Sequence, residues 1–191
     1  TRNFANKIEI MTFDDITQEV RRWSVKYDND EDNILDKVFE QWSDIVWLRA
    51  FFIENKDDLA SYFKVTDVNQ AIYDTIEDAD KLQCLILDIS PNANLDQIFR
   101  HLEPSRTSET VLGKEKAKGA NARHASWLRL YAIKLSAGVY IITGGAIKLT
   151  ATMQERAHTL AELLKMEQVR NFLISKDVID DDGFKDYLRE L

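Results

Sequence analysis

The stretch from residue 126 to residue 149 constrains the fold of this chain more than any other part of it. The segments SWLRLYAIKL (126–135) and VYIITGGAIKL (139–149) are rich in β-branched, aliphatic and aromatic residues, a composition typical of strands. Only three residues, Ser136, Ala137 and Gly138, separate them. We therefore predict a β-hairpin, and the rest of the core has to be built against it.

Two glycines interrupt the second strand of this hairpin. Glycine in the interior of a strand weakens it, so Gly144 and Gly145 call for an explanation. They either form a bulge that folding requires, or clear space for a ligand to approach the sheet, or do both.

The first half of the chain predicts one strand followed by helices. The segment RRWSVKY (21–27) alternates apolar and polar residues, as a half-buried strand does. Helical spacing of apolar residues follows in residues 31–42, 43–63 and 66–89, and a short helix is expected over residues 94–103. Residues 105–125 are polar and read as a loop or a mobile strand pair.

A second group of helices is predicted after the hairpin. The residues Thr152 to Glu155 form a capping box, which favours a helix start, and a short amphipathic helix runs from Phe184 to Leu191. This order predicts an α+β fold: a small antiparallel sheet with N-terminal helices packed on it and a C-terminal helical extension. The expected organisation is an N-terminal extension (1–19), an α+β domain (20–165) and a helical appendage (166–191).

Composition excludes several classes of protein. The single cysteine, Cys84, rules out an internal disulfide framework and is expected to be buried in its apolar run. No apolar run approaches the ~18 residues of a membrane span, and the first ten residues lack a signal-peptide core, so we expect a cytoplasmic protein without a membrane partner. Neither a phosphate-binding glycine motif nor a metal-ligand spacing is present, so no cofactor and no metal are expected.

The charge is distributed unevenly along the sequence. The chain has a net charge of −8, but residues 1–99 hold 10 basic and 21 acidic residues, whereas residues 100–170 hold 12 basic and 6 acidic ones. The basic segment also contains all three histidines. Either this segment binds a polyanion, or it is neutralised by the acidic half within the fold.

The basic segment supplies the candidate functional residues. Alternation places Arg129 and Tyr131 on one face of their strand, together with Trp127, and Lys148 interrupts the apolar partner strand. Lysine and arginine contact phosphate oxygens, and a tyrosine or histidine can move a proton during phosphodiester cleavage without a metal. Each of these side chains also has an ordinary structural interpretation in packing or ion pairing. The further candidates for nucleic-acid binding are Lys114, Lys116, Lys118, Arg123, His124, Arg156 and His158.

The hairpin and the segment after it resemble a known family. The residues R-L-Y-A-I-K-L, then V-Y-I-I-T-G-G-A-I-K-L-T, then a helix containing Ala157, resemble the RelE/HigB-like superfamily of bacterial toxins. Arg129, Tyr131, Gly145, Lys148 and Thr150 fall on that pattern. The chain departs from it where Leu149 stands in place of a second lysine, and in being long and acidic.

The resemblance implies a toxin of a toxin-antitoxin system that cleaves mRNA as a metal-independent endoribonuclease, as members of the family commonly do on the ribosome. It implies Arg129 and Lys148 as phosphate-contacting catalytic residues, Tyr131 as an acid or base, and an antitoxin as protein partner. The alternative is a catalytically inactive protein of the same fold that binds a helical protein partner.

Overall fold

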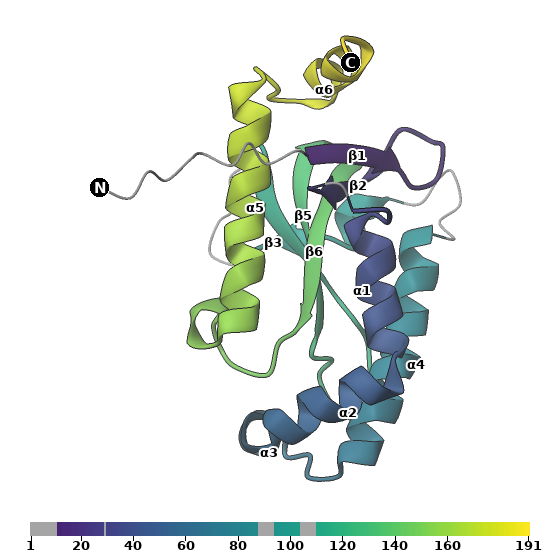
Figure 1. Ribbon diagram of the computed structural model, residues 1–191, viewed down its shortest axis with the longest axis vertical. Helices are drawn as coiled ribbons and strands as arrows, with labels where there is room; N and C mark the ends of the chain where they lie inside the picture. Colours follow the sequence, from purple (N-terminus) through teal and green to yellow (C-terminus); the bar gives the residue numbers. More distant parts are fainter. Residues whose placement is uncertain (1–10, 29, 88–93, 104–109) are drawn as a thin grey trace.

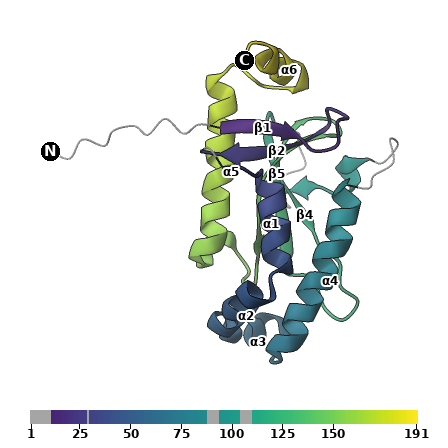
Figure 2. The same cartoon turned by 45° about the vertical axis from the view of Figure 1, so that its right-hand side comes forward.

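Six strands form a single mixed sheet in the computed structural model, which describes residues 11–28, 30–87, 94–103 and 110–191 (Figures 1 and 2). Their order across the sheet is β1-β2-β6-β5-β4-β3. The strands are β1 (Met11–Asp15), β2 (Arg22–Tyr27), β3 (Arg100–His101), β4 (Gly113–Lys118), β5 (Leu128–Ser136) and β6 (Val139–Ile147).

The predicted hairpin is confirmed as β5 and β6, which pair antiparallel at the centre of the sheet. The expectation of an antiparallel sheet needs one correction, because β2 runs parallel to β6. All the helices from α1 to α4 lie between β2 and the hairpin in the chain. Such a long connection allows two strands to meet in parallel, which a tight turn does not.

Helices cover both faces of the sheet. In Figure 1, α5 stands on one side of β5 and β6, while α1 and α4 stand on the other. The helices are α1 (Ile34–Ser43), α2 (Ile45–Glu54), α3 (Lys56–Phe63), α4 (Val68–Leu87), α5 (Ala157–Ser175) and α6 (Asp181–Arg189), with short 3₁₀ turns η1 (Leu95–Gln97) and η2 (Met153–Glu155). The α+β class is therefore observed, and the core lies in two layers, one on each side of the sheet.

At the two glycines of β6, side chains from both helical layers come close to the sheet. The register shifts between Tyr131 and Ala132, so that Thr143 is left over as a bulge directly before Gly144. A Cβ on Gly144 would overlap the carboxylate of Glu162 on α5. A Cβ on Gly145 would lie 3.0 Å from Trp42 on α1. The glycines thus accompany a bulge and also clear space, and what enters that space is the protein's own helices.

Several local predictions differ from the structure. The region 43–63 forms two helices rather than one, and the predicted helix over 94–103 is a 3₁₀ turn followed by β3. The capping box at Thr152 opens η2, and α5 begins at Ala157.

Cys84 is exposed, so its predicted burial is wrong. It lies on α4 between the buried residues Leu82 and Ile86, on the side of the helix that faces away from the core.

The segments on the two sides of each proposed domain boundary contact each other in the structure. Met11–Asp15 of the N-terminal extension forms β1, which pairs antiparallel with β2, and residues 1–10 lie outside the described residues. The boundary at residue 165 lies inside α5. Phe184 of α6 is fully buried and makes edge-on ring contacts with Phe13 and Trp23, so α6 is part of the same core.

Gly145→Ala is expected to destabilise the protein by about 1–3 kcal/mol, because the added methyl group overpacks the contact between α1 and β6. It would lie 2.9 Å from Val38 and 3.1 Å from the backbone oxygen of Arg129, neither of which is the end of a flexible chain. Urea denaturation measures the change. Gly113→Ala is the control, since its nearest contact would be 3.4 Å away, and equal loss of stability in both variants would contradict this account.

Candidate functional site

The register of β4, β5 and β6 brings basic side chains into rows on one face of the sheet. Lys116 lies opposite Tyr131, which lies opposite Gly144. In the next row Lys118 lies opposite Arg129, which lies opposite Ala146. Directly opposed residues point to the same face, and both rows face α5. The small residues on β6 leave room beside the long side chains from the other two strands.

A groove of about 660 Å³ lies between these rows and α5. We call it the cationic groove. One wall comes from β4 and β5, and the other from η2 and α5, including Leu163, Leu164 and Glu167. Its basic lining residues are Lys114, Lys116, Lys118, Arg129 and Lys148.

Arg129 and Lys148 are held in the groove by backbone carbonyls. Arg129 Nη1 donates to the carbonyl oxygens of Ser126 and Leu128 at 2.7 and 2.8 Å. Lys148 Nζ donates to the carbonyl oxygens of residues 150 and 151 at 2.9 and 2.7 Å. Burial lowers the pKa of both groups, and the charge of Arg129 further lowers the pKa of Lys148. The two cations are therefore close together and fixed by neutral partners, an arrangement that an anion would stabilise.

The lysines of β4 complete the positive surface. Lys116 Nζ donates to the carbonyl oxygen of Leu102 at 2.9 Å, and its pKa is lowered by burial and by Lys118, Arg129 and Lys148. Lys114 is paired with Glu167 of α5. Glu167 and Glu103 are the acidic residues of the lining, so the groove keeps an excess of positive charge.

Tyr131 forms part of the floor of the cationic groove. Its side chain is fully buried, and within the described part of the chain its hydroxyl has no hydrogen-bond partner. Burial raises the pKa of this hydroxyl, so it stays protonated at neutral pH. The raised pKa disfavours a role for Tyr131 as a base, and its hydroxyl is closed off from solvent.

Arg123 and His124 lie elsewhere, on the side of the sheet that faces α4. Both pair with Asp74, a fully buried carboxylate on α4, with His124 Nε2 at 2.8 Å from it. The ring of His124 stacks on Trp127 at 4.3 Å, and the Trp127 indole donates to Thr75. Trp127 therefore does not share the face of Arg129, because β5 begins only at Leu128.

Arg156 and His158 are also outside the cationic groove. Arg156 makes two hydrogen bonds to the carboxylate of Asp58 on α3, at 2.7 and 2.6 Å. His158 Nε2 lies 2.9 Å from the carbonyl oxygen of Ile147, and its ring contacts Phe51. The acidic half thus pairs with Arg123, Arg156 and Lys134 of the basic segment, whereas the groove holds one arginine, Arg129, beside its four lysines.

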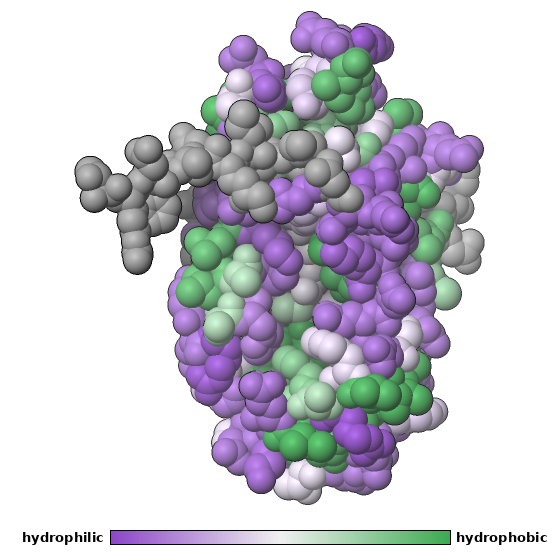
Figure 3. Space-filling view, viewed as in Figure 1, coloured by the Kyte–Doolittle hydropathy of each residue, from purple (hydrophilic) through white to green (hydrophobic). Residues whose placement is uncertain are grey.

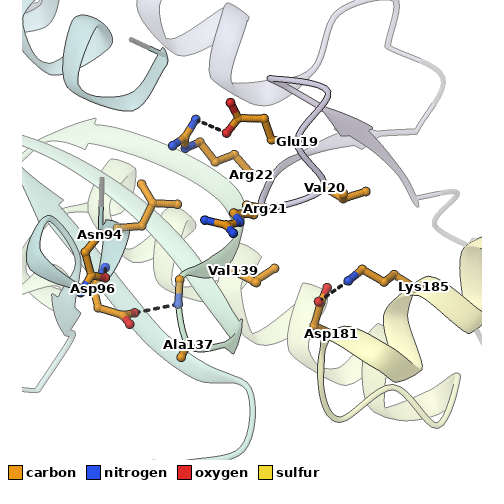
Figure 4. A pocket seen from close by; sticks show the side chains of 12 residues that line it. Glu19, Val20, Arg21, Arg22, Asn94, Asp96, Ala137, Val139, Asp181 and Lys185 are labelled. Carbon is orange, nitrogen blue, oxygen red and sulfur yellow. Dashed lines mark hydrogen bonds and ion pairs between the residues drawn. The ribbon is translucent and has the colours of Figure 1, made fainter. Parts of the chain in front are cut away.

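A larger cavity, of about 770 Å³, lies near the β5–β6 turn (Figure 4). Its lining holds three acidic and three basic side chains, although Nε and Nη1 of the buried Arg22 have no hydrogen-bond partner among the described residues. Arg22 lies 3.6 Å from Glu19, Lys185 lies 2.6 Å from Asp181, and Asp96 accepts a hydrogen bond from the Gly138 amide. This balance of charge gives no preference for an anion, so the smaller cationic groove is the stronger candidate for phosphate binding.

Two residues that shape the groove were not found from the sequence. Glu167 lies on α5 one turn after Leu163, and both line the groove. The only available signal was the helical spacing that places them on one face of the predicted helix. The spacing gives no information about which strand that face meets.

The described ranges show no group of three or more histidine, cysteine, aspartate or glutamate side chains that could hold a metal ion. In the same ranges no helix is long and apolar enough to cross a membrane.

Comparison with protein-family models, curated proteins and solved structures finds no match.

Asp74→Asn is expected to lower the free energy of unfolding by about 1–3 kcal/mol. The buried carboxylate of Asp74 accepts hydrogen bonds from three side chains, whereas an asparagine replaces one of its acceptor oxygens by an NH2 donor. Gln70, Arg123 and His124 all bond to this carboxylate. Urea denaturation measures the change. Asp186→Asn is the matched control on an exposed pair, and equal midpoints for both variants would contradict the role given to Asp74.

Glu162→Gln is expected to flatten the dependence of stability on pH. Burial raises the pKa of Glu162 above its ordinary value of 4.5, although Lys165 partly opposes this. The carboxyl group is protonated in both states at low pH. As the pH rises past 4.5, the unfolded chain loses its proton first, so stability falls until the raised folded pKa is passed. The glutamine variant should gain stability relative to the wild type over this window in thermal unfolding, and a constant difference would contradict the assignment.

Proposed function

We propose that this chain is an RNA-directed toxin of the RelE/HigB kind, which holds RNA phosphates in the cationic groove and cleaves the strand there without a metal. One observation carries the proposal: five basic side chains from β4, β5 and the end of β6 converge on one groove. Arg129 and Lys148, which the resemblance assigns to phosphate contact, are both among them.

The chemistry rests on charge stabilisation. A phosphodiester gains negative charge when a ribose 2′-oxygen attacks its phosphorus, and Arg129 and Lys148 are positioned to stabilise that charge. The 2′-hydroxyl loses its proton to a base, the bond from phosphorus to the 5′-oxygen breaks, and that oxygen takes up a proton. The products are a 2′,3′-cyclic phosphate and a 5′-hydroxyl.

Lysine is a better candidate for the base than Tyr131. The Tyr131 hydroxyl is buried and its pKa is raised, whereas the pKa values of Lys116 and Lys148 are lowered by burial and by neighbouring cations. Burial and the neighbouring cations favour the neutral, proton-accepting form of Lys116, while Lys148 keeps the role of a phosphate-contacting cation. The proposal therefore gives Tyr131 a supporting role in the floor of the groove.

The second candidate is an inactive protein of similar architecture that binds a helical partner. It is favoured by the exposed apolar side chains of α2, where Ile45, Val46 and Ile53 are 54, 79 and 56% exposed. This helix lies at the lower end of the molecule in Figure 1, where Figure 3 shows apolar surface. The growth experiment below separates the two candidates.

Lys118→Ala is expected to weaken binding of a fluorescein-labelled single-stranded RNA and to reduce its salt dependence. Removing one phosphate contact lowers the slope of log K against log salt by about 0.7. Fluorescence anisotropy at several salt concentrations measures both. Arg156→Ala is the matched control, since Arg156 pairs with Asp58 outside the groove. Equal effects of the two substitutions would place the RNA elsewhere.

Expression of the wild type in bacteria is expected to arrest growth and shorten mRNA, while Arg129→Ala and Lys148→Ala restore growth. Each variant lacks a cation that would face the phosphorus. Loss of such a group is expected to reduce the rate of RNA cleavage by a factor of about 10²–10³. Growth curves and RNA blots provide the measurement. Wild-type protein that is folded and harmless would favour the inactive interaction protein, and equal toxicity of all three proteins would refute the assigned residues.

A further inference from the structure

The edge of β6 has no strand partner over residues 143–147 within the part of the chain that the structure describes. β2 pairs with β6 only as far as Ile142, and the bulge follows at Thr143. This bulge belongs to the β5–β6 ladder and bends β6 at the point where its pairing with β2 ends. An unpaired strand edge carries backbone groups that are ready to pair with another chain.

Side chains cover the two ends of this edge but not its middle. The hydroxyl of Tyr27 donates to the carbonyl oxygen of Thr143, and His158 Nε2 lies 2.9 Å from the carbonyl oxygen of Ile147. Gly145 lies between these two positions. The edge is therefore open over its centre.

The backbone of Gly145 points out of the sheet at this edge. The amide of Lys148 donates to Trp127, so Lys148 faces toward β5. Backbone groups of successive residues in a strand alternate in direction, which turns Ile147 and Gly145 the other way. The contact of His158 with the Ile147 carbonyl agrees with this direction. Both the N–H and the C=O of Gly145 are thus available to a partner strand.

A groove of about 390 Å³ surrounds this edge, and we call it the edge groove. Trp42, Trp47 and Phe51 of α1 and α2 line one side, and His158 and Glu162 of α5 line the other. In Figure 1, β6 is visible between α5 and α1, and Figure 3 shows white and green surface in the middle of the same view. The edge groove is thus aromatic on one side and polar on the other.

The polar side of the edge groove is acidic. Glu162 is 8% exposed, and its Oε2 has no hydrogen-bond partner among the described residues, while its Oε1 accepts from Lys165 at 2.8 Å. On the opposite, aromatic side, Glu54 at the end of α2 adds a second carboxylate to the lining of the groove. A buried carboxylate oxygen without a donor is costly, and a donor supplied by a ligand would relieve that cost.

We infer that the edge groove binds an extended peptide segment of another protein, which adds to the edge of β6 as a further strand. At about 3.3 Å per residue, the open edge fits roughly five residues. A peptide residue opposite Gly145 points its side chain to the α1 side, against Trp42. Its two neighbours point to the α5 side, toward Glu162. The segment therefore has an apolar residue flanked by arginine or lysine, and its binding is independent of RNA in the cationic groove.

The test uses the peptide acetyl-Thr-Arg-Leu-Arg-Thr-amide and follows tryptophan fluorescence of the full chain, since Trp42 and Trp47 line the groove. The expected dissociation constant is on the order of 1 mM or tighter. The same peptide methylated on the leucine nitrogen loses the donor to Gly145 and should bind at least tenfold more weakly. Replacing both arginines by glutamate should have a similar effect.

Glu162→Gln should weaken binding of the arginine peptide about tenfold, while Asp186→Asn, at an exposed ion pair on α6, should leave it unchanged. Absence of binding up to about 10 mM peptide would overturn the inference. Equal binding of the methylated peptide would also overturn the inference. This comparison uses only the wild-type protein, so it remains decisive even if Glu162→Gln fails to fold. Failure of RNA binding has no bearing on these outcomes, so the two proposals fail separately.

Discussion

The antiparallel register of β4, β5 and β6 is the constraint on which the rest of this structure depends. Opposed residues share a face, so Lys116, Tyr131 and Gly144 form one row and Lys118, Arg129 and Ala146 the next. A slip of one residue would move every member of these rows to the other face. The rows combine long basic side chains on β4 and β5 with small residues on β6, and this difference in size creates the cationic groove.

The bulge at Thr143 links that groove to the second open surface. It lies where β6 leaves β2, directly before the glycines that admit Glu162 on one face and Trp42 on the other. The same short segment therefore sets the distance of α5 from the sheet and leaves the edge of β6 unpaired. The two candidate binding surfaces therefore lie on either side of one short segment of β6, and they differ in charge and in the ligand that they suit.

Much of the local structure was predictable from the sequence, because it depends on neighbouring residues. The hairpin, the strand 22–27 and the long helix α4 follow from apolar periodicity, and the capping box at Thr152 forms as expected. The location of Arg129, Lys148 and the three lysines of β4 on one groove agrees with their grouping as candidate residues. Alternation along a strand was enough to relate Arg129 to Tyr131.

Features that depend on distant partners were not predictable in the same way. Arg123 and His124 pair with Asp74, and Arg156 pairs with Asp58, which lies 98 positions earlier in the chain. No local pattern indicates which carboxylate pairs with which cation, and these three candidate residues lie outside the cationic groove. The parallel pairing of β2 with β6 has the same origin, since it joins segments separated by the whole helical layer.

The most direct test of the central claim is an NMR titration of the isotope-labelled chain with a four-nucleotide uridine RNA. The account predicts that the perturbed backbone amides cluster at Lys116, Lys118, Arg129 and Lys148, and at the η2 turn beside them. Perturbations that cluster instead around Arg123 and Asp74, around Arg156 and Asp58, or at the cavity beside Arg22 would contradict it.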